Sequence, residues 1–260
     1  MSVLDAVILS IVEGLTEFLP VSSTGHMIMA SHIMHLPQTE FLKTFEIAIQ
    51  WGAIGAVFFL YWRTFLLDWE IGVKVLAAFV PTAVVGFILY KFIKKYLLSN
   101  VFVVGTALLA GGIFLIAFEL FYKRRGPPQI KVNGLEQITY RQAVIIGLCQ
   151  AVAVIPGVSR SAATIVGGLC LGLSRKTVVE FSFLLAVPTM TAATALDLLK
   201  SGAEIDGPQW GILAVGFAGA FAVALAAVKF LLHYVKYYDF IPFGIYRVGA
   251  GLLALLWIGK

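Results

Sequence analysis

Charged residues are scarce in this sequence. Only 13% of the 260 residues are Asp, Glu, Lys or Arg, whereas a typical soluble domain carries about 25%. Hydrophobic residues make up 60%, and the mean hydropathy is strongly positive. This composition excludes an ordinary soluble domain and indicates an integral membrane protein.

Cysteine is also rare, and a basic leader is missing. Cys149 and Cys170 lie in apolar surroundings without a CxxC or metal-binding pattern, so both are expected to be small packing residues. The first residues lack a positive region, and Asp5 and Glu13 interrupt the first apolar run. We therefore expect no cleavable signal peptide.

The 19 basic residues outnumber the 14 acidic ones, which alone would suit a nucleic-acid partner. Most of them, however, cluster between apolar runs, where basic residues set membrane topology and meet anionic lipid head groups. We therefore expect the bilayer, and no nucleic acid, as the partner of these charges.

Six apolar segments are long enough to cross a membrane as helices. They lie at about 44–62, 72–92, 101–122, 178–199, 210–231 and 240–259. Two further apolar regions, about 4–35 and 142–173, are broken near their middles by LPVSSTG and IPGVSRSAAT. Proline interrupts helices, and small polar residues favour turns and helix N-caps. Because each half is too short to cross alone, we predict two re-entrant helix–loop–helix hairpins.

The two broken regions align at an offset of 136 residues, which pairs Pro20 with Pro156 and Ser23 with Ser159. Each is followed by three spans, and because three is odd, the second copy must be inverted. The predicted fold is an all-α polytopic membrane protein with six transmembrane helices and two re-entrant hairpins in an inverted-topology repeat. It forms a single domain over 1–260, with repeats over about 1–123 and 140–260.

Basic residues are distributed unequally between the two sides of this arrangement. One side holds 11 of them, namely Arg63, Lys74, Lys123, Arg124, Arg125, Lys131, Arg141, Arg175, Lys176, Lys229 and Lys236. The other side holds 6, namely Lys43, Lys91, Lys94, Lys95, Lys200 and Lys260. The richer side is predicted to be cytoplasmic, which places the first hairpin and both termini toward the outside.

Two carboxylates stand out in the first broken region. Glu13 and Glu17 are four residues apart and share one helix face, where like charges repel. An acidic side chain at the bilayer centre costs roughly 2.5–3.5 kcal/mol on insertion scales. A divalent cation such as Mg²⁺ or Ca²⁺, or a cationic side chain, would compensate both charges. The alternative is that the carboxylates lie near a polar surface or are protonated.

Reactive groups follow at once. Ser22, Ser23 and Thr24 offer hydroxyls, Gly25 allows close backbone approach, and His26 can donate, accept or shuttle a proton. A lone histidine in a membrane segment is usually a packing residue. After two carboxylates and a hydroxyl cluster, His26 is interpreted as functional.

The second broken region supplies an anion-binding group. Arg160 lies between Ser159 and Ser161, directly after a Pro-Gly break and before an apolar helical run. Its guanidinium matches phosphate oxygens, and hydroxyls and a helix N-terminus can converge on the same anion. Together the two regions offer a cation site, a proton-transfer group, a candidate nucleophile and an anion clamp, which is the equipment for phosphoryl transfer.

Other polar residues lie within the spans. Four of them are expected either to support the site from behind or to make helix-packing hydrogen bonds, namely Glu46, Gln50, Glu180 and Ser182. Glu119 and Asp197 are near span ends and are expected to be solvated. The role of Arg247 is left open, with an acidic neighbour as one candidate partner.

The motifs EGLTEFLPVSSTGH (13–26) and PGVSRSAAT (156–164), with EFSFLLAVP (180–188) and IPFGIYR (241–247), resemble the bacterial undecaprenyl-diphosphatase family, the bacitracin-resistance type called BacA or UppP. The resemblance spans essentially the whole chain. It implies hydrolysis of undecaprenyl diphosphate to the monophosphate, which recycles the lipid carrier of peptidoglycan synthesis, and a required divalent cation.

The resemblance also implies an inverted repeat, a homodimer, and a location in the bacterial cytoplasmic membrane with the site opening to the periplasmic side. On matching positions, the family's functional residues are Glu13, Glu17, Ser23, His26, Ser159 and Arg160. Ser161 and Thr24 are added here as phosphate-binding hydroxyls and Ser22 as a neighbouring group.

Three chemical alternatives remain open: Ser23 attacks phosphorus with His26 as base, His26 attacks directly, or His26 activates water. A rival function also remains. Inverted repeats with broken helices are a transporter design, so a polyprenyl-phosphate flippase or transporter would fit the same architecture.

Overall fold

The structure is a computed structural model, and it describes residues 1–92, 96–97, 100–124, 130–201 and 206–258. These residues form ten α-helices, with short 3₁₀ turns at Leu135–Gln137 and Val152–Val154, and contain no named strand. The predicted all-α class is confirmed.

Five helices are long and apolar enough to cross a membrane, which confirms five predicted spans and a polytopic membrane protein. They are α3 (Glu40–Leu67), α4 (Trp69–Phe92), α5 (Val101–Arg124), α8 (Arg175–Ser201) and α9 (Gly207–Tyr234). The sixth predicted span differs. Its helix α10 covers only Ile241–Leu253 and continues as a π-helical turn over Ala254–Ile258, so it is shorter than a regular span.

Both predicted interruptions are present. The first region forms α1 (Val3–Thr16) and α2 (Ser23–Ile33), and the second forms α6 (Tyr140–Ala151) and α7 (Arg160–Cys170). We call residues 17–22 the first tip and residues 152–159 the second tip. Each tip lacks regular α-helix and ends in a serine at the N-cap position, directly before the next helix.

The serines that end the tips correct the predicted alignment. Ser22 and Ser159 are the N-caps of α2 and α7, and their backbone angles are nearly equal, with φ of 74° and 76°. This left-handed conformation is uncommon for residues other than glycine. The structural offset is therefore 137 residues rather than 136, and Ser23 corresponds to Arg160 instead of Ser159. The second tip has one more residue between its proline and its serine than the first tip, so the matched prolines hide the matched serines.

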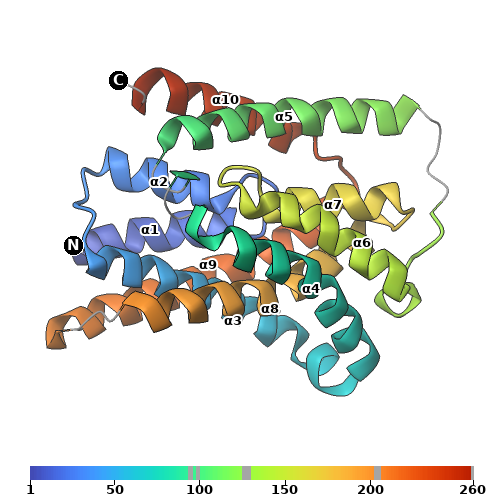
Figure 1. Ribbon diagram of the computed structural model, residues 1–260, viewed down its shortest axis with the longest axis horizontal. Coiled ribbons are helices and arrows are strands. Elements are labelled where there is room, and N and C mark those ends of the chain that lie inside the picture. The colour runs from blue at the N-terminus through green and yellow to red at the C-terminus, as the bar shows by residue number, and fades with distance from the viewer. Residues whose placement is uncertain (93–95, 98–99, 125–129, 202–205, 259–260) are drawn as a thin grey trace.

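Helix packing also pairs the two halves. Figure 1 shows α5 and α10 side by side along one edge of the molecule, while α1 packs on α9 and α6 packs on α4. Glycines make these contacts close. A Cβ on Gly112 of α5 would lie 2.7 Å from the carbonyl oxygen of Gly244 on α10, and a Cβ on Gly244 would lie 3.0 Å from that of Gly112. Small residues at such crossings are the usual means of packing membrane helices.

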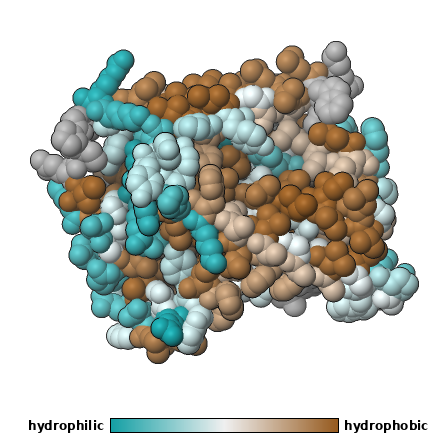
Figure 2. Space-filling view, turned by 180° about the vertical axis from the view of Figure 1, so that it is seen from behind, coloured by the Kyte–Doolittle hydropathy of each residue, from teal (hydrophilic) through white to brown (hydrophobic). Residues whose placement is uncertain are grey.

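The surface is apolar over much of its area. Figure 2 shows hydrophobic residues across the larger part of one face and hydrophilic residues gathered toward one end. Lys123, Arg175 and Lys236, all predicted for one side of the membrane, line one cavity of about 510 Å³. The structure thus brings these three basic residues to the same end of the molecule.

Glu119 lies behind this basic end, and the prediction that it is solvated is wrong. Its side chain is fully buried and forms a two-point ion pair with Arg175, with N–O distances of 2.5 and 2.7 Å. It also accepts a hydrogen bond from the backbone N–H of Phe240. The ion pair therefore joins α5, the start of α8 and the start of α10. The structure says nothing about the side chain of Asp197, which lies outside the described side chains.

Candidate active site

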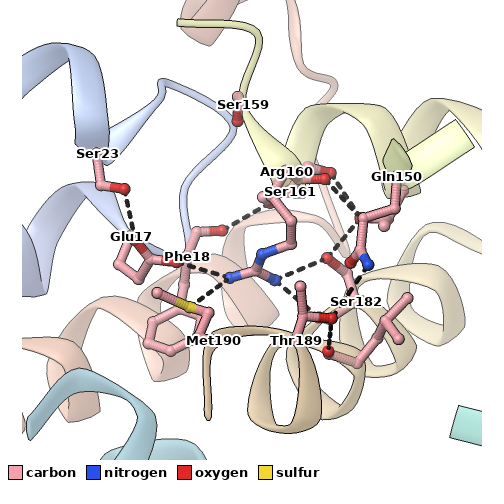
Figure 3. A network of polar contacts seen from close by, with 12 residues as sticks. Glu17, Phe18, Ser23, Gln150, Ser159, Arg160, Ser161, Ser182, Thr189 and Met190 are labelled. Carbon is pink, nitrogen blue, oxygen red and sulfur yellow. Dashed lines mark hydrogen bonds and ion pairs between the residues drawn. The ribbon is translucent and has the colours of Figure 1, made fainter. Parts of the chain in front are cut away.

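The two tips meet inside the molecule. The Ser161 hydroxyl, in the first turn of α7, donates to the backbone carbonyl of Phe18 in the first tip at 2.8 Å. Next to it, the Arg160 side chain reaches from α7 to Glu17. Figure 3 shows Ser23 and Arg160 approaching Glu17 from opposite sides. Residues 143 positions apart thus form one polar cluster.

Glu17 is the centre of this cluster. It is the C-cap of α1, where the chain leaves the helix, and it is 6% exposed. Its Oε2 accepts a hydrogen bond from the Ser23 hydroxyl at 2.5 Å, and its Oε1 accepts one from Arg160 Nη2 at 2.9 Å. A carboxylate in this position can orient the serine and take up its proton.

Arg160 is held in place by neutral groups as well as by Glu17. Its Nη1 donates to the carbonyl of Ser182 on α8 at 2.8 Å, and its guanidinium lies 5.7 Å from the centre of the Phe18 ring. The buried Nε has no hydrogen-bond partner among the described residues. A buried unpaired donor is unusual, and here it leaves one N–H to offer an anion.

His26 lies one helical turn beyond Ser23 on α2, but both of its ring nitrogens have other partners. Nδ1 is 2.7 Å from the Ser22 carbonyl oxygen, and Nε2 is 2.8 Å from the Tyr246 hydroxyl on α10. The geometry favours Glu17 over His26 as the group that accepts the Ser23 proton, which is an arrangement outside the three alternatives above.

Glu13 lies one turn before Glu17 on α1 and is 2% exposed. Its Oε1 has no partner in the part of the chain that the structure describes. In the same described residues, no group of three or more His, Cys, Asp or Glu side chains is arranged to hold a metal ion. The unpaired oxygen of Glu13 beside the Glu17 carboxylate nevertheless fits a divalent cation whose other ligands are phosphate oxygens and water.

The other predicted residues lie at helix starts, behind the cluster, or away from it. Ser22, Ser159 and Thr24 lie at the starts of α2 and α7, where the Ser159 oxygen accepts the Ala162 N–H and keeps its own proton for donation. Ser182 contacts Arg160 directly, and Glu46 accepts a hydrogen bond from Ser31 at 3.3 Å.

Glu180 and Gln50 are not joined to this cluster by any contact among the described residues. Glu180 instead contacts Tyr61 and Lys176. Its position two residues from Ser182 turns it to another side of α8, because residues two apart do not face each other on a helix.

The contribution of α10 to the site was not predicted from the sequence. Arg247 is 1% exposed, and its hydrogen-bond partners among the described residues are the carbonyl oxygens of Pro20, Ala107 and Gly157. The acidic neighbour considered as a candidate partner is therefore not among these partners. Arg247 links the first tip to the second, and the motif IPFGIYR was the only signal in the sequence that pointed to it.

The fold and the cluster define a polytopic helical membrane protein whose two tips meet in a buried polar cluster. The family model described as bacitracin resistance protein BacA matches residues 6–253. The chain belongs to this family.

Similar proteins match along nearly their whole length. The undecaprenyl-diphosphatase of Sulfurihydrogenibium sp. (strain YO3AOP1) is 50% identical over 257 residues, which cover 99% of this chain and 100% of that protein. The undecaprenyl-diphosphatase of Aquifex aeolicus (strain VF5) is 47% identical over 249 residues, 96% of each chain. That of Persephonella marina (strain DSM 14350 / EX-H1) is 47% identical over 258 residues.

Proposed function

We propose that this protein is a membrane phosphatase that hydrolyses undecaprenyl diphosphate to undecaprenyl phosphate and inorganic phosphate. In the cell it recycles the lipid carrier of peptidoglycan synthesis and thereby gives resistance to bacitracin. Family membership and the names of the similar proteins support this function. The observation that carries it is the shared contact of Ser23 and Arg160 with the Glu17 carboxylate.

The geometry favours Ser23 as the nucleophile. Glu17 takes the hydroxyl proton while Oγ attacks the terminal phosphorus. The bond from phosphorus to the bridging oxygen breaks, and its electron pair leaves on undecaprenyl phosphate. Once Glu17 is protonated its charge is lost, so Arg160 is released from the ion pair and can neutralise the transferred phosphoryl group. Ser159 and Thr24, at two helix N-termini, add hydroxyl donors.

A divalent cation fits this arrangement. Glu13 and Glu17 would hold Mg²⁺ or Ca²⁺, and the ion would neutralise the charge of the diphosphate when bound. Ser161 is used differently from its predicted role, because its proton is donated to Phe18 O, and in this proposal it ties the two tips together. Ser182 supports Arg160 from α8, whereas Glu46 is bonded to Ser31.

The proposal includes the placement in the cell. The protein lies in the bacterial cytoplasmic membrane with α1–α5 and α6–α10 as an inverted repeat, and it acts as a homodimer with its site open to the periplasmic side. The first helix of each half packs on the fourth helix of the other half, α1 on α9 and α6 on α4, which supports the repeat. The basic residues around one cavity support the orientation. A polyprenyl tail stays in the bilayer, because each exposed CH₂ costs about 0.8 kcal/mol.

The deciding experiment is phosphate release from undecaprenyl diphosphate by the purified protein in detergent. Turnover should be observed, should stop in excess EDTA, and should return when Mg²⁺ or Ca²⁺ is added in excess of the chelator. Thr106→Ala, which removes a hydroxyl on α5 whose bonds go to the carbonyls of Phe102 and Val103 in its own helix, serves as a matched control for Ser23→Ala. A protein that transports polyprenyl phosphate in liposomes without releasing phosphate would instead be the rival flippase.

A further inference from the structure

Among the described residues, Tyr246 is the hydrogen-bond partner of the Nε2 atom of His26. The tyrosine comes from α10, 220 residues further along the chain, and is 51% exposed, whereas His26 is 8% exposed. The pair therefore runs from a buried ring nitrogen to a hydroxyl at the edge of the protein. The first step of the proposed reaction uses Glu17 and Ser23 and leaves this pair without a function.

The hydrogen bonds fix which nitrogen of His26 carries its proton. A carbonyl oxygen only accepts, so the 2.7 Å contact with Ser22 O requires a proton on Nδ1. In the neutral ring Nε2 is then an acceptor, and the Tyr246 hydroxyl donates to it. His26 is thus held ready to take up one proton, and that proton must come through the tyrosine oxygen.

The position of Tyr246 is fixed by its neighbour. Arg247 is fully buried and donates to Gly157 O at 2.9 Å, with longer contacts to Ala107 O and Pro20 O. These bonds lock α10 against both tips, so the Tyr246 hydroxyl has a defined place relative to α2. On α2, His26 follows Ser23 by three residues, which puts the two side chains on one face about 5–6 Å apart at Cβ.

We propose that Tyr246 and His26 form the proton relay for the second half of the reaction, in which water hydrolyses the phosphoserine formed on Ser23. Water gives a proton to the Tyr246 oxygen, and Tyr246 passes its own proton to His26 Nε2. The water oxygen attacks phosphorus, the bond from phosphorus to Ser23 Oγ breaks, and Oγ recovers the proton held by Glu17. Inorganic phosphate leaves, and His26 returns its proton to solvent.

This division of work explains why Ser23 contacts Glu17 and not the histidine three residues away. Each step has its own proton acceptor: Glu17 for the serine and His26 for the water. The inference rests on the proposed function, because it needs a phosphoserine, and it adds a residue and a step that the first chemical step does not require.

Tyr246→Phe tests the relay, since it removes only the hydroxyl. We expect kcat to fall by about 10²-fold, within the usual range for acid–base groups, while KM stays within about twofold and the Tm is unchanged. Rapid acid quench with radiolabelled substrate should show phosphoserine accumulating on most of the variant molecules, and little of it on the wild type. Tyr140→Phe is the matched control, because Tyr140 is similarly exposed and lies outside the site.

A double-mutant cycle separates the relay from a packing effect. His26→Gln should also accumulate phosphoserine, and His26→Gln with Tyr246→Phe should be no slower than His26→Gln alone. If Tyr246→Phe turned over substrate as fast as the wild type, or were slower without accumulating phosphoserine, the relay would be wrong. The proposed phosphatase activity would still stand. Phosphate release from the wild type with no phosphoserine in any variant would overturn both the serine nucleophile and the relay. No phosphate release at all would overturn the proposed function itself.

Discussion

Ser22 and Ser159 adopt the same left-handed backbone conformation at the N-caps of α2 and α7. On this match, the two tips align at an offset of 137 residues. The residue after Ser22 is Ser23, which contacts Glu17 with its hydroxyl, and the residue after Ser159 is Arg160, which contacts the same carboxylate with its guanidinium. Equivalent positions thus carry different chemistry.

Ser23→Ala should lower phosphate release at least about 10³-fold, because loss of a nucleophile removes the first step. The loss of one hydroxyl should leave the Tm almost unchanged. Turnover and thermal unfolding of the purified variant in detergent measure both points. Activity within tenfold of the wild type would move the attack to His26 or to water.

Glu13→Gln should separate a metal role from an ion-pair role. Glu13 has an unpaired oxygen and no cationic partner among the described residues, so neutralising it should weaken metal activation while stability is kept or increased. The measurement is the concentration of Mg²⁺ or Ca²⁺ that gives half-maximal turnover, which we expect to rise at least tenfold. An unchanged metal dependence would remove Glu13 from the cation site.

Arg160→Lys should lower turnover by on the order of 10²-fold, because lysine keeps the charge but not the planar pair of N–H donors. Arg160→Ala should also destabilise the fold, since it leaves Glu17 buried without its cation. Breaking such a buried pair costs about 3–5 kcal/mol. Thermal unfolding in detergent should therefore rank the wild type above Arg160→Lys and Arg160→Ala last. Wild-type turnover by the lysine variant would reduce Arg160 to a structural charge.

Glu119→Gln should affect stability and spare the chemistry. Glu119 is fully buried against Arg175 at the basic end of the molecule, so the variant should lose about 3 kcal/mol and several degrees of Tm. At temperatures where the variant stays folded, its KM and kcat should match the wild type. A selective fall in kcat without a change in Tm would connect this ion pair to the site.

Two glycines on α10 give a matched test of helix packing. A Cβ on Gly251 would lie 2.6 Å from the backbone N of Leu109 on α5, whereas one on Gly249 would meet nothing within 4 Å. Gly251→Ala should destabilise the protein by about 1–3 kcal/mol, because the backbone cannot move aside easily. Gly249→Ala should be neutral or slightly stabilising. Equal Tm values for both variants would contradict the α5–α10 packing.

Much of the fold could be predicted because apolar length is a direct signal. Five spans and both interruptions follow from long hydrophobic runs and from prolines followed by small polar residues. The sixth span, predicted over about 240–259, is helical over residues 241–258, but composition cannot reveal that its α-helix ends at Leu253 and continues as a π-helical turn. The sequence aligned the tips at an offset of 136, because Pro20 matches Pro156. The backbone angles match Ser22 with Ser159, at an offset of 137.

The site could be predicted in part for a similar reason. Glu17, Ser23 and Arg160 lie in motifs whose residue types suggest their chemistry, and the structure brings the three together. The contact of His26 with Tyr246 and the bonds of Arg247 to Pro20, Ala107 and Gly157 could not be predicted, because they join residues 90 to 227 positions apart on different elements. Burial of Glu119 was missed because its cation lies on another helix.

The correspondence between Ser23 and Arg160 has a consequence for ancestry. Two identical copies of a half-sized chain, inserted in opposite directions, would carry either two serines or two arginines at this place and so would lack one of the two functions. Gene fusion frees each half to diverge alone. On the inverted repeat proposed here, the present asymmetry of the tips is the trace of that divergence, and the same residue at both positions would remove one of the two functions.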